Sequence, residues 1–376
     1  QELAGGTEVR LKWSGRIEEG INAIKEGEIQ LKGISFQHRE IPVPISHLEG
    51  SFLFSPEQVR FDGLKGKLGD SSITVSGSLS RVSTSRSPTQ PSKTEAGRGS
   101  AGPDRLLSFQ IFSPQMDLDP VLPKRERTTP TSYDKLRDWL SNWSFDGKVV
   151  VEQGKYHSLH YRDLKSEMKT VDGKLFIHPF QLRGDGGDVW GEGWVQSTEK
   201  GIRFEIKPRI SDMEAKAFLR TVLQKGEEEK VMVSGRIHVD KVELRGEGED
   251  FQKVKESLNG RLRLEIEEGV IERFNILSKI FSILNVSQLL MGRLPDLKTK
   301  GLPFHQIMAN IYVQNGIAST DDFVVDSDAM KITLIGKVDL GKKQIDARIG
   351  IHPLVTLDTV LSKVPIAGYI LTGKEK

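Results

Sequence analysis

The residues that could carry chemistry in this chain are few, and they do not converge on one site. His157 and His160 stand three positions apart and could form a metal pair, but no acid or third histidine has a spacing that fits them. The one Gly-x-Gly-x-x-Gly match, at residues 97–102, lies in a Ser-, Thr- and Pro-rich stretch with no strand before it, so it does not indicate a nucleotide site. The sequence has no Gly-x-Ser-x-Gly, His-Glu-x-x-His or P-loop motif. We therefore expect a protein that is not an enzyme and that has no catalytic residue, metal or cofactor.

Four acidic residues could suggest a calcium site, but their surroundings favour turns. Asp185, Asp188, Asp326 and Asp328 each lie beside Gly or Ser. Asp is common in turns because its carboxylate accepts hydrogen bonds from the turn backbone. Turn chemistry explains these residues without a bound cation.

Composition narrows the classes of protein further. Lys and Arg number 54 and Asp and Glu number 52, so no excess of positive charge indicates a nucleic-acid partner. The absence of cysteine excludes disulfides and thiolate metal sites. The sequence contains no uncharged apolar run of about 18 residues, the length that would predict a membrane-spanning helix. It does not begin with a signal peptide. We expect a piece of a longer protein, with any export signal or membrane anchor outside this chain.

Alternation of apolar and charged residues is the dominant pattern. Residues 261–267 read Arg-Leu-Arg-Leu-Glu-Ile-Glu, which predicts a strand with one dry and one wet face. The same pattern recurs along the chain, and it predicts a mainly β protein with a few helices. We expect a long curved antiparallel sheet that the helices cap or flank. The candidates for its dry face are Ile73, Val75, Val149, Val151, Phe204, Ile206, Leu262, Leu264, Ile266, Ile332, Leu334, Val338, Ile345 and Ile349.

Breaks in the pattern suggest four segments. Residues 1–80 read as strands, 81–105 as a disordered linker or insertion rich in Ser, Pro and Gly, 106–244 as strands with helices near 131–143 and 211–225, and 245–376 as a C-terminal region with a helix near 270–291. The second helix is expected to begin with a capping box at residues 211–214. At Val242 the apolar positions shift phase by one, which predicts a β-bulge.

The predicted helix at 270–291 has a wide apolar arc. Its apolar face includes Phe274, Leu277, Ile280, Phe281 and Leu284. Such a helix could plug the end of the sheet, or it could also touch lipid or a membrane surface. Its polar face is not strongly basic, which weakens binding to a membrane surface.

The function of the protein depends on what covers the dry face of the predicted sheet. A globular sandwich would pair two such faces and fill the space between them with large side chains. Here the predicted helices are few and aromatic residues make up 7% of the chain. A long sheet with so little cover must curl on itself or bind something apolar.

The C-terminal third resembles a known family. Residues 277–285 (LSKIFSILN), 301–304 (GLPF), 315–322 (NGIASTDD) and 332–340 (ITLIGKVDL) are similar, in this order, to the C-terminal region of AsmA-like proteins, the group that includes YhdP and TamB. The similarity is densest over about residues 245–373. It implies a repeating β-groove, a taco-shaped antiparallel sheet with an apolar interior, and it implies no catalytic residue.

The resemblance also implies a cellular setting. Members are large envelope proteins of Gram-negative bacteria, anchored in the inner membrane by an N-terminal helix and implicated in moving phospholipid towards the outer membrane. On this basis we expect a periplasmic segment of a bridge-like lipid transport protein, with phospholipid as its ligand and a membrane at each end of the full-length protein. Envelope proteins are possible further partners. The alternative is a non-enzymatic structural or assembly factor for outer-membrane biogenesis that acts through protein–protein contacts.

Overall fold

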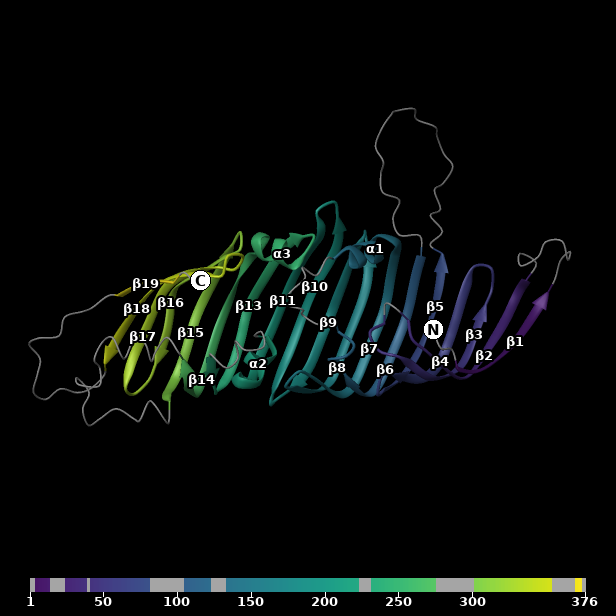
Figure 1. Ribbon diagram of the computed structural model, residues 1–376, viewed down its shortest axis with the longest axis horizontal. Helices are drawn as coiled ribbons and strands as arrows, with labels where there is room; N and C mark the ends of the chain where they lie inside the picture. The colour runs from purple at the N-terminus through teal and green to yellow at the C-terminus, as the bar shows by residue number, and fades with distance from the viewer. Residues whose placement is uncertain are drawn as a thin grey trace, which may run out of the picture. The chain divides into compact units, whose positions relative to one another are not determined.

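The computed structural model in Figure 1 describes residues 4–13, 24–38, 41–81, 105–122, 133–222, 231–274, 301–353 and 369–373. These residues form 19 strands and three helices, and all 19 strands belong to one sheet. The chain divides into two compact units. Unit 1 comprises Gln1–Lys155, Tyr161–Leu182 and Glu192–Phe204, and unit 2 comprises Tyr156–His160, Arg183–Gly191 and Glu205–Lys376. The prediction of a mainly β chain built on an open, curved antiparallel sheet with a few helices is confirmed.

In unit 1 the strands pair in chain order. They are β1 (Ala4–Trp13), β2 (Ile24–Phe36), β3 (Ile45–Phe54), β4 (Gln58–Leu68), β5 (Ser71–Arg81), β6 (Arg105–Asp117) and β7 (Trp143–Tyr156). From β1 to β6 each strand is antiparallel to the next. Strands β6 and β7 are parallel, so the chain must cross over between them, and helix α1 (Asp134–Asn142) lies in that crossover. The sequence did not predict this parallel pair.

Strand β7 ends in unit 2 at Tyr156, and four further strands contribute residues to both units. They are β8 (Leu159–Val171), β9 (Lys174–Gly184), β10 (Gly187–Thr198) and β11 (Gly201–Glu214). The β9–β10 turn contains Asp185 in a left-handed conformation, with φ of 47°, as turn chemistry predicts.

Unit 2 is a run of antiparallel hairpins. Its strands are β12 (Val231–Val233), β13 (Arg236–Gly248), β14 (Asn259–Phe274), β15 (Leu302–Gln314), β16 (Ile317–Asp326), β17 (Met330–Asp339), β18 (Gln344–Pro353) and β19 (Tyr369–Gly373). From β13 to β19 each strand pairs with the next. Helix α2 (Ala215–Val222) precedes β12, and α3 (Phe251–Ser257) lies between β13 and β14.

The predicted helix boundaries need correction. Residues 211–214, expected to begin a helix, are the end of β11, and the helix starts only at Ala215. The cap is Glu214, whose carboxylate accepts hydrogen bonds from the backbone N–H groups of Lys216 and Ala217 at 3.1 and 2.6 Å. Helix α1 ends at Asn142, one residue earlier than predicted.

The helix predicted at 270–291 begins too early. Residues 270–274 belong to β14, where they pair with β12 and β15, so Phe274 is a strand residue. Leu277, Ile280, Phe281 and Leu284 lie outside the described residues, as do residues 82–104 of the linker predicted at 81–105. The two end residues of that prediction, Arg81 and Arg105, belong to β5 and β6. Among the described residues no helix is long and apolar enough to cross a membrane.

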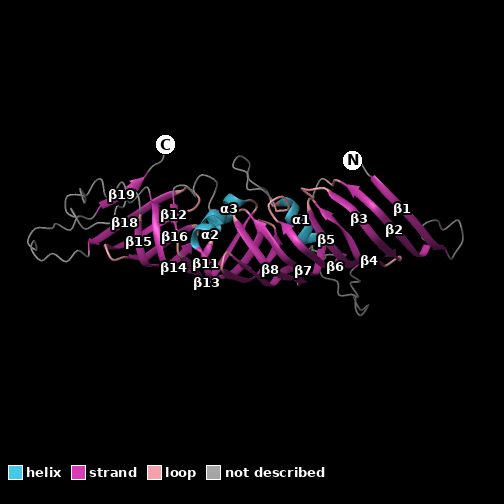
Figure 2. Cartoon of the chain, turned by 90° about the horizontal axis from the view of Figure 1, so that it is seen from below, coloured by secondary structure: helices cyan, strands magenta, loops and turns pink. Residues whose placement is uncertain are grey.

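Bulges curve the sheet within each unit. The β13–β14 register shifts between Asp240 and Glu243, which confirms the bulge predicted at Val242. Further shifts occur in the β4–β5, β15–β16 and β16–β17 pairs. A bulge adds local twist and bends its strand, and Figure 2 shows the strands of each unit crossing one another in projection, as in a curled sheet.

Candidate functional site

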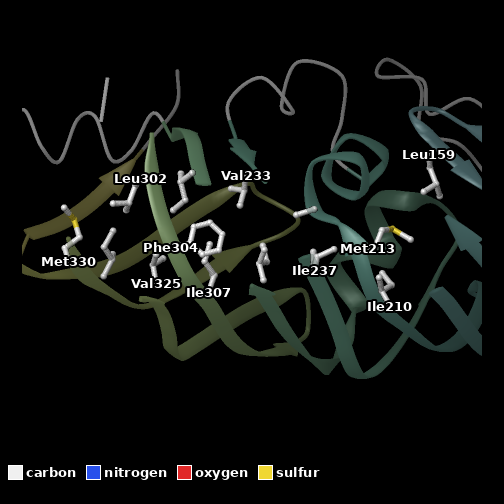
Figure 3. Packing of buried hydrophobic residues seen from close by; sticks show 14 residues of the cluster. Leu159, Ile210, Met213, Val233, Ile237, Leu302, Phe304, Ile307, Val325 and Met330 are labelled. Atoms are coloured by element: carbon white, nitrogen blue, oxygen red, sulfur yellow. The ribbon is translucent and has the colours of Figure 1, made fainter. Parts of the chain in front are cut away.

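The dry face of the sheet in unit 2 is the candidate site. A row of apolar side chains crosses six strands through the directly paired residues Ile237, Ile266, Ile307, Val325, Ile332 and Ile351. The first five are between 1% and 5% exposed. They belong to a buried cluster that also holds Ile210, Met213, Phe304 and Met330 (Figure 3). We call this row the base row.

A second row lies beside the base row, two residues further along each strand. It contains the paired residues Val239, Leu264 and Ala309, and, beyond the β15–β16 bulge, Phe323, Leu334 and Ile349. All except Ala309 are only partly buried and pack against the cluster or beside it. We call this row the middle row.

Beyond the middle row the exposure of the apolar face is uneven. Val338 pairs with Ile345 near the β17–β18 turn, and Ile345 is 51% exposed, whereas Val242, Val313 and Ala347 are buried. The apolar face is therefore closed by the protein's own packing at the base row, partly accessible in most of the middle row and accessible at Ile345. A trough with one closed wall and one open mouth has this distribution of burial.

The opposite face of unit 2 is wet. Cross-strand ion pairs join Arg261 to Glu243 at 3.1 Å and Lys337 to Asp346 at 3.7 Å. These side chains alternate with the apolar ones along the strands, as the period of two requires. The two faces differ in chemistry while sharing the same strands.

In unit 1 the dry face is continuous too. One row runs through Val9, Ile29, Phe52, Phe61, Gly77, Phe109 and Gly147, all directly paired from β1 to β7. The glycines leave space that neighbouring rings fill, because a Cβ atom on Gly147 would collide with the Phe109 ring. Helix α1 touches this face, where Trp139 stacks on Phe145 with ring centroids 5.7 Å apart.

The predicted candidates fall on these faces to different degrees. Val75 and Val149 are joined through Ile111, and both are partly buried, as is Ile73. Val151 is 0% exposed and opposite Ser113, so it offers no free surface. In β11, Phe204 is partly buried, and Ile206, in unit 2, is exposed.

Sequence reasoning missed about half of the unit 2 trough. It named the residues of β14 and β17, and Ile349 of β18. It did not name Ile351 of β18 or the partners from β13, β15 and β16, namely Ile237, Val239, Ile307, Ala309, Phe323 and Val325. The signal was present for β15 and β16 as alternation, but Asp322 and Met308 interrupt it near the bulge.

Unit 1 also has a hollow that the sequence did not predict. It has a volume of about 1170 Å³ and is lined by charged and hydroxyl side chains of β2 to β9 together with the apolar residues Leu53, Phe61, Phe109, Met168, Val171 and Phe176. Many of these groups are already paired. Lys148 contacts Glu167 at 3.1 Å, and Ser76 donates to Asp62 at 3.0 Å. The hollow therefore combines apolar side chains with polar groups, several of which are paired with one another.

Of the histidines and acids that sequence analysis considered for chemistry, the structure brings Asp185 and His160 close together. His157 stacks on Tyr156 in the β7–β8 turn, with ring centroids 4.3 Å apart. Burial raises the pKa of the Asp185 carboxyl, which lies near His160, and one of its oxygens has no hydrogen-bond partner. Among the described residues no group of three or more His, Asp or Glu is arranged to hold a metal ion.

Comparison with known proteins decides the family. Residues 148–376, more than half of the chain, match the family model described as YhdP protein. The chain belongs to the YhdP family. It is also 23% identical over 199 residues to the AsmA family protein YhjG of Escherichia coli (strain K12). That match covers 53% of this chain and 27% of the relative, so the chain spans only part of that protein's length. No solved structure matches the chain.

The YhdP match covers the whole described part of the unit 2 trough. It begins within β7 and includes every residue of the base and middle rows. Membership of the YhdP family associates the chain with the bacterial envelope, and with envelope biogenesis or lipid transport at the level of the family. The resemblance to AsmA-like proteins noted from the sequence is confirmed.

Proposed function

We propose that this chain is a periplasmic segment of a lipid transport protein and that its apolar face holds the acyl chains of phospholipids. The observation that carries the proposal is the partial exposure of the unit 2 trough. The base row is packed shut, whereas the middle row apart from Ala309, and the Val338–Ile345 pair, leave apolar surface accessible. Contiguous exposed apolar surface on a protein commonly marks a binding site.

The energetics explain why such a surface suffices. Exposing an acyl chain to water costs about 0.8 kcal/mol per CH₂ group, or roughly 20 kcal/mol for two ordinary chains. A trough of Leu, Ile, Val and Phe side chains removes most of that cost, because it offers apolar contact along the length of each chain. The polar head group remains in water at the open mouth. No covalent step is involved, so we propose that the protein is not an enzyme.

The wider setting follows from the family and the sequence. We propose that the full-length protein is anchored in the inner membrane by a segment outside this chain, and that it leads phospholipid through the periplasm between the inner and outer membranes. The membranes at its ends, and envelope proteins there, would be its partners. Nucleic acid would not be a partner.

The test is lipid analysis of the purified chain. We expect phospholipid to co-purify and to be identified by mass spectrometry of an organic extract. We also expect the delipidated chain to take up a fluorescent acyl probe. If neither bound lipid nor probe uptake is found, the chain acts in another way, such as a structural or assembly factor that binds proteins through its sheet.

A further inference from the structure

Helix α2 belongs to an excursion that the sheet does not need for its continuity. Strands β11 and β13 pair directly with each other, although α2 and β12 lie between them in the sequence. The excursion returns through β12, whose three residues pair with the end of β14. A tight turn would have joined β11 to β13, so the extra residues have another role.

The excursion lies on the apolar face of unit 2 and touches it directly. Ala215 is 0% exposed and belongs to the same buried cluster as Ile237 and Ile266. Phe218 and Leu219, one turn further along α2, pack against that cluster. Close packing leaves no room for an acyl chain between the helix and the floor beneath it. Helix α2 therefore occupies trough surface and does not roof an open space.

Its attachment is small. Helix α2 has eight residues, a length that is marginal without tertiary contacts. Glu214 caps its first turn, and Lys216 forms an ion pair with Glu272 of β14 at 3.1 Å. The Ser158 hydroxyl donates a hydrogen bond of 3.5 Å to the Ala217 carbonyl. Among the described side chains of α2 only Ala215 is fully buried, whereas Phe218 and Leu219 are partly buried, so α2 is expected to open at a lower free-energy cost than the strands of the sheet.

We propose that α2 is a displaceable strap that competes with acyl chains for the apolar surface at the base row of the unit 2 trough. When α2 is packed against the sheet, Phe218 and Leu219 cover apolar surface that would otherwise be exposed. When a lipid arrives, its chains replace these two side chains and α2 moves away. This inference rests on the proposed function, and it adds that the trough of unit 2 is self-occluded when empty.

Two opposite variants test the strap. Phe218→Ala removes the larger of the two contacts, and Arg220→Ala, on an exposed position of the same helix, is its control. A second pair, Lys216→Cys with Glu272→Cys, can be joined by a short bismaleimide to pin the strap, because the chain contains no other cysteine. The control is the same pair capped with a monofunctional maleimide. Circular dichroism and thermal melting establish that each variant is folded.

The measurement is the binding of a fluorescent fatty acid to the delipidated chain. We expect Phe218→Ala to bind more tightly, by up to about tenfold if the strap is closed for nine-tenths of the time. We expect the pinned chain to bind fewer probe molecules than the capped control. Weaker binding by Phe218→Ala would mean that α2 forms part of the binding wall, and this result would overturn the strap.

The outcomes separate this inference from the proposed function. If the unmodified chain binds the probe and both variants behave like their controls, the strap proposal is wrong, whereas the proposed function is supported. If neither the unmodified chain nor Phe218→Ala binds the probe, both are wrong. If Phe218→Ala binds the probe and the unmodified chain does not, the result supports both the strap and the proposed function.

Discussion

Adjacent residues of β17 show how the two faces diverge at the scale of single side chains. Leu334 is partly buried between Phe323 and Ile349, whereas Ile335 is 57% exposed and stands opposite Arg348. The two residues are nearly identical in hydrophobicity and size. They differ in the residues that lie opposite them on the neighbouring strands, so only Leu334 contributes to the trough.

This neighbour pair gives a matched mutational test. We expect Leu334→Asp to reduce acyl-probe binding by about tenfold or more, because a carboxylate in the middle row is costly to desolvate beside an acyl chain. Ile335→Asp places the same charge on the wet face and should leave binding within about twofold, since its side chain remains solvated. Equal losses in both variants, with both folded, would argue that binding does not use the dry face.

Glycine at position 147 is required by packing. A Cβ atom there would strike the ring of Phe109, while the nearest atom to a Cβ at Gly6 is 3.8 Å away. We expect Gly147→Ala to lower the free energy of unfolding by about 1–3 kcal/mol, the usual cost of overpacking. Gly6→Ala should change it little. Chemical denaturation of both variants measures the difference, and equal effects would contradict the packing argument.

His305 of β15 lies between Glu268 of β14 and Asp328 of the β16–β17 turn, and its contribution to stability depends on pH. Its Nε2 atom lies 2.9 Å from Asp328 and its Nδ1 atom 3.6 Å from Glu268. The hydrogen bond with Asp328 is the main cause of a raised pKa for His305, and Glu268 adds to it. A histidine whose pKa is raised in the folded state stabilises the protein fully below its unfolded pKa and loses that contribution as the pH rises through the folded pKa.

We therefore expect the His305→Asn variant to melt below the unmodified chain in acid and to approach it in alkali. The difference in melting temperature between the variant and the unmodified chain, measured at about pH 5.5 and about pH 9, gives this gap below and above the titration of His305. Asp328→Asn should narrow the gap in acid, because it removes the partner that favours the imidazolium. A gap that widens as the pH rises would contradict the assignment.

At the scale of elements, the strands were predictable and the helix boundaries were not. Alternation predicts β14 and β17 because each strand has one dry face, and the phase change at Val242 locates a bulge. Residues 211–214 read as a capping box, yet β11 continues through them because Met213 is buried in the apolar cluster. Residues 270–274 likewise stay in the sheet because β12 and β15 offer them partners. Tertiary pairing outweighed local helix signals in both places.

The cap of α2 provides a prediction at this scale. We expect Glu214→Ala to destabilise the helix by about 0.5–2 kcal/mol, since two backbone N–H groups lose their acceptor. Hydrogen exchange of the α2 amides should speed up while exchange in β14 stays unchanged. Glu205→Ala, which removes only an ion pair with Lys207 on β11, is the control. Unchanged exchange in α2 would show that the cap does not hold the helix.

At the scale of the whole molecule, sequence predicts the class of fold but not the membership of the site. The period of two and the resemblance of the C-terminal third predict an open sheet with a dry face. They do not give the partners across strands, so Phe323 and Ile307 were missed beside their predicted neighbours Leu334 and Ile266. The parallel β6–β7 pair and the hollow of unit 1 depend on long-range register, which no local pattern encodes.

The central claim is that lipid chains lie against the dry face, and photo-crosslinking from defined positions tests it most directly. A photoreactive amino acid at position 334 points into the trough, and the same group at position 335 points into water on the other face. After irradiation with phospholipid vesicles, the account predicts that intact-protein mass spectrometry finds a phospholipid adduct from position 334 and little from position 335. Equal labelling at both positions, or none at 334, would contradict it.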